Sequence, residues 1–117
     1  MLPISDTTID AIEYALVALE TRSRVTANNV ANAEVPNFGA SRVEFESQLA
    51  RAVHQGDVRA LGAPAVTAYG GERDATGNDV DIESEVVDMI QTNLLEQSMV
   101  EAFNFKTGLL KTAIRGQ

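Results

Sequence analysis

Residues 27–39 organise the rest of the chain and read Ala27-Asn28-Asn29-Val30-Ala31-Asn32-Ala33-Glu34-Val35-Pro36-Asn37-Phe38-Gly39. Pro36 has no amide hydrogen and favours an extended conformation at Val35, so a helix that leads into this stretch must end before Pro36. Asparagine is a poor helix-interior residue, because its side-chain amide bonds to nearby backbone groups. Phe38 is the only aromatic residue of the stretch. We therefore predict a helix end, a sharp exit of the chain, and one aromatic anchor beyond it.

The residues before this stretch have the pattern of one long helix, from about residue 6 to residue 32. Its apolar residues recur at intervals of three and four, the spacing of a coiled-coil seam, at Ile9, Ile12, Leu16 and Leu19. A helix of this length would extend on the order of 40 Å at about 1.5 Å per residue. We expect these four side chains to pack against another helix.

A second, shorter helix is predicted over residues 41–55. Ser41 and Glu44 have the spacing of a capping box at its start. Phe45, Leu49 and Val53 follow at four-residue intervals and would form a narrow apolar stripe. Gly56 stands where a glycine commonly ends a helix.

Residues 56–78 are rich in glycine and alanine and lack a clear period. Val66 and Tyr69 are among the few residues that favour a strand, so the β signal is weak. No glycine-rich phosphate-binding spacing is present. We expect an irregular or weakly β insertion that is extended or mobile.

The longest helical pattern covers residues 80–114. Acidic residues crowd its start and basic residues its end, which matches the helix dipole at both ends. Its apolar residues occupy more than one face, so we expect neighbours on more than one side. The predicted packing positions are Val86, Ile90, Leu94, Val100, Phe103 and Leu110.

Together these patterns predict a mainly α fold in one domain, residues 1–117. Residues 1–40 would form the N-terminal helix and its Asn/Pro junction, residues 41–78 the middle helix and flexible insertion, and residues 79–117 the C-terminal helix. We expect the two long helices to pair antiparallel as a coiled-coil-like assembly domain. The order of charges motivates this arrangement, because it places Asp10 near Lys106 and Lys111, and Arg22 near Glu96.

Composition excludes several classes of function. The chain has no cysteine, a single histidine (His54) and a net charge of −8, which argue against thiolate or histidine-rich metal sites and against nucleic-acid binding. Asp79, Asp81 and Glu83 have ligand-like spacing, but acids at a helix start are better explained by capping. No nucleophile motif is present. We expect no enzyme activity, no cofactor and no small-molecule substrate. No apolar run is long enough for a membrane span, and no cleavable signal is visible.

The segment Asn29-Val30-Ala31-Asn32-x-x-x-Pro36-x-Phe38 resembles the N-terminal motif of bacterial flagellar rod and hook proteins. That motif usually reads Asn-aliphatic-Ala-Asn-x-x-Thr-Pro-Gly-aromatic. Val35 stands in place of the usual Thr, and Asn37 in place of the usual Gly. The resemblance implies that Asn29, Ala31, Asn32, Pro36 and Phe38 form an assembly motif.

Residues 77–85 and 109–114 also resemble the flagellar basal-body rod family, most closely its proximal, type B subunits, with type C subunits as the nearest alternative. The resemblance implies a structural subunit of the rod that self-assembles through its terminal helices into an axial drive shaft. Its partners would be copies of itself, other rod subunits, the membrane-ring adaptor protein and the flagellar export apparatus. It would lie in the periplasm after export without a cleaved signal peptide. A soluble helical binding module, such as an export chaperone, is the alternative from another class.

Overall fold

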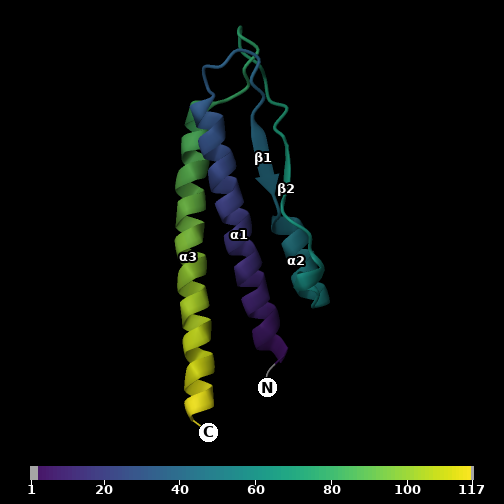
Figure 1. Cartoon of the computed structure of the whole chain (residues 1–117), viewed down its shortest axis with the longest axis vertical. Helices are drawn as coiled ribbons and strands as arrows, with labels where there is room; N and C mark the ends of the chain where they lie inside the picture. Colours follow the sequence, from purple (N-terminus) through teal and green to yellow (C-terminus); the bar gives the residue numbers. More distant parts are fainter. Residues whose placement is uncertain (1–2, 117) are drawn as a thin grey trace.

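The computed structural model describes residues 3–116, and the side chains of residues 7–116. Its elements are α1 (Pro3–Ala31), β1 (Ser41–Glu44), α2 (Glu46–Gln55), a short 3-10 helix η1 (Val58–Ala60), β2 (Ala65–Ala68) and α3 (Ile82–Arg115). The chain is elongated, with extents of 66 × 24 × 14 Å. Figure 1 shows α1 and α3 side by side in opposite directions, with the small β and α2 layer against α1.

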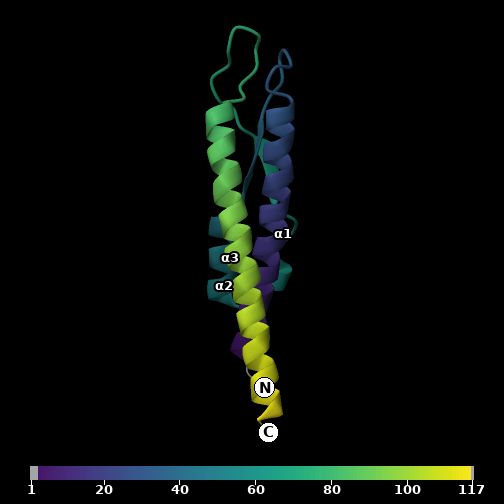
Figure 2. The same cartoon turned by 90° about the vertical axis from the view of Figure 1, so that its left-hand side faces the viewer.

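The predicted pairing of the two long helices is confirmed. Figure 2, turned by 90°, again shows α1 and α3 side by side, with the two chain ends at the same end of the molecule. The charges that motivated the prediction have other partners. Arg22 pairs with Glu46 at 2.8 Å, and Asp10 pairs with Arg59 at 3.0 Å. The helices therefore pair through packing, and these acidic and basic groups tie α1 to the middle of the chain.

The prediction of a helix that starts at Ser41 is wrong, because Ser41–Glu44 form strand β1. β1 pairs antiparallel with β2, and Val43 lies opposite Val66. The capping-box spacing is a local signal, and strand pairing with residues more than twenty positions away overrides it. Helix α2 begins only at Glu46 and ends at Gly56, which adopts the left-handed conformation expected of a C-terminal glycine.

Side chains of α1 satisfy the edge of β1 that faces away from β2. The backbone carbonyl of Val43 accepts hydrogen bonds from the Arg22 guanidinium at 3.1 Å (Nε) and 2.7 Å (Nη2). The Asn29 side chain bonds both backbone groups of Ser41: it donates to the carbonyl and accepts from the N–H. An unpaired strand edge invites other strands, so these contacts both close the edge and fix the sheet on α1.

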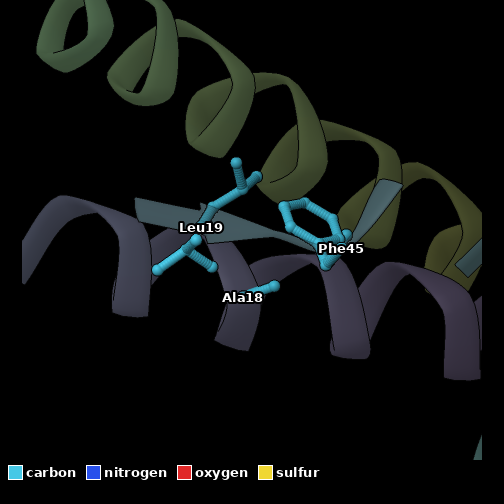
Figure 3. Close-up of a cluster of buried hydrophobic side chains, with 5 residues drawn as sticks. Ala18, Leu19 and Phe45 are labelled. Carbon is cyan, nitrogen blue, oxygen red and sulfur yellow. The ribbon is translucent and has the colours of Figure 1, made fainter. Parts of the chain in front are cut away.

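A small apolar core lies where the three layers meet. It consists of Ala15, Ala18, Leu19, Val43 and Phe45, with Tyr14, Val25, Leu49 and Met99 packed against it. Figure 3 shows Leu19 and Phe45 in the space between the α1 and α3 ribbons. Phe45 also lies 4.9 Å under the Arg22 guanidinium, a cation–π contact. The buried alanines allow the neighbouring elements to approach α1 closely.

Because of the Arg22–Glu46 pair, we expect the free energy of unfolding to decrease slightly at acidic pH. The hydrogen bonds from Arg22 lower the pKa of Glu46 from 4.5 to about 2. Because the folded-state pKa is depressed, the pair stabilises the fold fully above about pH 4.5, and this contribution is lost as the pH falls towards 2. Glu46 is more than half exposed, so screening limits the effect to about 0–1 kcal/mol. The free energy of unfolding, measured with denaturant, should fall less at acidic pH for Glu46→Gln than for wild type. The same pH dependence in both proteins would show that the Arg22–Glu46 pair does not stabilise the fold.

Candidate assembly junction

The junction is the end of the molecule where residues 28–40, which leave α1, meet residues 73–81, which lead into α3. Helix α1 ends at Ala31, before Pro36, as predicted. The side-chain amide of Asn32 donates to the Asn28 carbonyl at 2.8 Å. The same carbonyl accepts from the Asn32 backbone N–H at 3.2 Å, so Asn32 reinforces the last helical turn.

Asn29 has a different role from the one its sequence context suggested. It is 1% exposed, and its amide nitrogen donates to the Ser41 carbonyl and to Glu85 Oε1, both at 2.9 Å. Its Oδ1 accepts from the Ser41 backbone N–H at 3.0 Å. One side chain therefore joins α1, β1 and α3. Burial raises the pKa of Glu85, while the Asn29 hydrogen bond acts in the opposite direction.

Asn78 is the residue of the junction that we did not select as a site residue from the sequence. It is 2% exposed and donates to the carbonyls of Asn32 at 2.9 Å and Val35 at 2.8 Å. Its Oδ1 accepts from the Val80 N–H at 2.7 Å. Asn78 therefore holds the exit from α1 against the segment that enters α3. The only signal in the sequence was its place in the Gly77–Glu85 segment on which the resemblance rests.

The proposal that Asp79 caps the last helix is wrong. Its buried Oδ1 accepts from the Ala40 N–H at 2.6 Å, and its Oδ2 is buried without a hydrogen-bond partner, 4.0 Å from Arg73 Nη2. Asp81 is the N-cap instead, and accepts from the backbone and hydroxyl of Ser84. Arg73 donates to the carbonyls of Phe38 and Gly77, so it also bridges the two halves of the junction.

Two residues of the junction have positive φ angles. Asn37, which replaces the usual Gly of the motif, has φ 62°, and Gly77 has φ 84°. The Asn37 N–H donates to the Thr76 carbonyl at 2.9 Å, so the two turns are joined. Asparagine tolerates the left-handed conformation better than other residues with a side chain. The departure from the motif at residue 37 is therefore compatible with a sharp turn.

Gly77→Ala is expected to destabilise the fold by about 1–3 kcal/mol. An added Cβ would lie 2.3 Å from Asn37 Oδ1, and the positive φ would add strain. Thermal or urea unfolding of the purified chain measures the effect. Adding Asn37→Gly removes the clash but not the strain, so the double variant should recover part of the loss. No recovery would show that the Asn37 side chain is not the obstacle.

The other residues of the predicted assembly motif are less buried. Phe38 is half-buried, whereas Ala31 and Pro36 are exposed. The fully buried aromatic residue is Phe45, seven positions further along the chain. The role of Asn29, Ala31, Asn32, Pro36 and Phe38 in assembly stays a prediction, because it concerns contacts between chains.

The predicted helix-packing residues fall into two groups. Ile12 and Leu19 are buried, and Ile9, Leu16, Phe103 and Leu110 are half-buried. Val86, Ile90, Leu94 and Val100 are 43–58% exposed on α3. Their packing role stays a prediction about a neighbouring chain.

Among the side chains of residues 7–116, no three histidine, cysteine or carboxylate groups lie so that they could hold a metal ion. None of the helices in residues 3–116 is both long and apolar enough to cross a membrane. What the junction does is structural: buried amides and a carboxylate connect backbone segments far apart in the sequence.

The described part of the chain is an elongated antiparallel helical hairpin with a hydrogen-bonded junction at its closed end, the architecture of a structural rather than a pocket-forming protein. The chain is 33% identical to the flagellar basal body rod protein FlgB of Cereibacter sphaeroides, over 88% of this chain and 90% of that protein. It is 30% identical to FlgB of Bacillus subtilis, over 93% and 94%, and 31% identical to FlgB of Aeromonas hydrophila, over 90% of each. No protein-family model matches the chain.

The chain belongs to the FlgB family of flagellar basal body rod proteins. It is therefore a structural subunit of the rod and not an enzyme. The type B assignment is confirmed, and neither the type C alternative nor the soluble binding module is supported.

Proposed function

We propose that the chain builds the proximal part of the rod by packing α3 against neighbouring chains, which are copies of itself and other rod subunits. The observation that carries this proposal is where the exposed hydrophobic side chains lie. Of the sixteen large hydrophobic side chains that are exposed in the described part of the chain, eleven are on α3. A monomer rarely leaves so much apolar surface on one element unless it is covered by a partner.

The outer face of α3 is defined here as Val86, Val87, Ile90 and Leu94. These residues are 43–58% exposed and share one side of the helix, at spacings of one, four and eight residues from Val86. By contrast, Val17 is the one large hydrophobic residue of α1 that is exposed among the described side chains. The asymmetry favours α3 as the helix that meets neighbouring chains.

The proposal extends to position in the cell. A subunit of this kind would pass through the flagellar export apparatus without a cleaved signal peptide and assemble in the periplasm on the adaptor protein of the membrane ring. The family resemblance supports this route, and the absence of a membrane-spanning helix in residues 3–116 is compatible with it.

The test is deletion of the gene from its own flagellated bacterium, followed by electron microscopy of isolated basal bodies. We expect membrane rings without a rod, and rods again when the gene is restored on a plasmid. Complete rods in the deletion strain would refute the proposed function.

A further inference from the structure

Two surfaces in the described part of the chain have complementary charge. One is an acidic groove beside the first half of α3. The other is the basic end of α3, which in Figures 1 and 2 extends beyond the start of α1. Both belong to the same chain, so each copy offers one acceptor and one donor.

The groove has a volume of about 520 Å³ and is formed mainly by α1, β1 and α3, with Glu46 of α2, Tyr69 and Asp81 at its edges. α1 supplies Arg22, Val25 and Thr26, β1 supplies one wall, and α3 supplies the other from Ser84 to Leu95. Five carboxylates line it, against two guanidinium groups: Glu44, Glu46, Asp81, Glu85 and Asp88 against Arg22 and Arg42. Arg22 is already paired with Glu46, and Arg42 lies over the Tyr69 ring at 4.3 Å. The groove is therefore left with an excess of negative charge.

The basic end of α3 carries Lys106, Lys111 and Arg115. Two of its apolar side chains are highly exposed: Phe105 is 68% exposed and Ile114 is 72% exposed. Opposite charges on two surfaces steer their association and fix its register. An exposed helix end with both basic and apolar side chains has the chemistry to enter an acidic groove whose walls include Val25, Val43 and Leu95.

We propose that the basic end of α3 of one copy docks in the acidic groove of a second copy, so that successive chains are staggered along their length. This rests on the proposed function, since it names the contact that self-assembly would use. Asp88 and Lys111 lie 23 residues apart on one helix, so the stagger would be about 34 Å. This stagger would also place the outer face of one α3 near the exposed apolar side chains at the basic end of the next α3.

The contact is heterologous: the groove of one chain meets the helix end of another, and each chain keeps a free groove and a free end. Such contacts do not close on themselves and generate open assemblies, as a shaft requires. An antiparallel pair of α3 helices would also match acid with base, but it would close into a dimer. The experiment below separates these two arrangements.

The test is disulfide trapping of the full-length chain, whose natural sequence has no cysteine. Asp88→Cys and Lys111→Cys are combined in one chain. Because both positions are on the same straight helix, they cannot reach each other within a molecule. The control combines Lys111→Cys with Glu20→Cys, an exposed position on α1 outside the groove.

On oxidation we expect a ladder of dimers, trimers and higher species from the Asp88→Cys/Lys111→Cys chain, formed about tenfold faster than from the control. A product that stops at a dimer would overturn the stagger in favour of the closed pair. A ladder no faster than the control, or no product, would overturn the contact altogether. If rods still form when the deleted gene is restored, only this contact fails; if they do not, the proposed function fails as well.

Discussion

Phe45→Ala is expected to lower the free energy of unfolding by about 3–5 kcal/mol, the usual cost of removing a buried aromatic ring. Phe45 is 5% exposed and belongs to the core cluster, against which Met99 of α3 also packs. It stands 6.5 Å from the Tyr14 ring, centroid to centroid, and below the Arg22 guanidinium. A core this small has little else to compensate for the cavity. Urea unfolding followed by circular dichroism measures the loss.

Phe38→Ala is the matched control, because it removes the same ring from a half-buried position. We expect about 1–2 kcal/mol, in proportion to the smaller apolar area that is lost. If Phe38→Ala cost as much as Phe45→Ala, the anchor of the fold would lie at the junction and not in the core.

Asn29→Leu has the second largest expected effect, a loss of about 2–5 kcal/mol. Leucine has nearly the same size but leaves the N–H and C=O of Ser41 without their partners, and each unsatisfied buried group costs about 1–3 kcal/mol. Asn93→Leu, an exposed change on α3, should stay within about 0.5 kcal/mol of wild type. Equal stability of the two variants in thermal melts would show that Asn29 does not hold β1 on α1.

The long helices could be predicted because their signal is periodic and local. Ile12 and Leu19 recur at helical spacing and are buried as that spacing requires. Gly56 ends α2 because it adopts the left-handed backbone conformation. The order of charges correctly suggested antiparallel helices. Arg22, however, forms its ion pair with Glu46 in the middle of the chain and not with Glu96.

The junction could not be derived because its partners are distant in the sequence. Asn29 bonds to residues 12 and 56 positions away, and Asn78 to residues 46 and 43 positions away. Local hydrogen bonding at a helix end is enough to explain an asparagine there. The sequence therefore gives no sign that the side chain is buried and bonded to distant residues. The prediction of a helix start at Ser41 and Glu44 was wrong for the same reason, because their capping-box spacing gives no sign of the pairing with β2.

We propose that the exposed apolar residues of α3 form a surface through which the subunit joins the rod. Ile90→Glu and Val17→Glu test it as a matched pair, because the two side chains are 57% and 56% exposed on the two helices. Both purified variants should unfold within about 0.5 kcal/mol of wild type, as surface changes do. Basal bodies are then isolated from cells that carry each variant as the only copy of the gene. We expect rods in cells with Val17→Glu and none in cells with Ile90→Glu; complete rods with Ile90→Glu would show that this face of α3 is not needed for assembly.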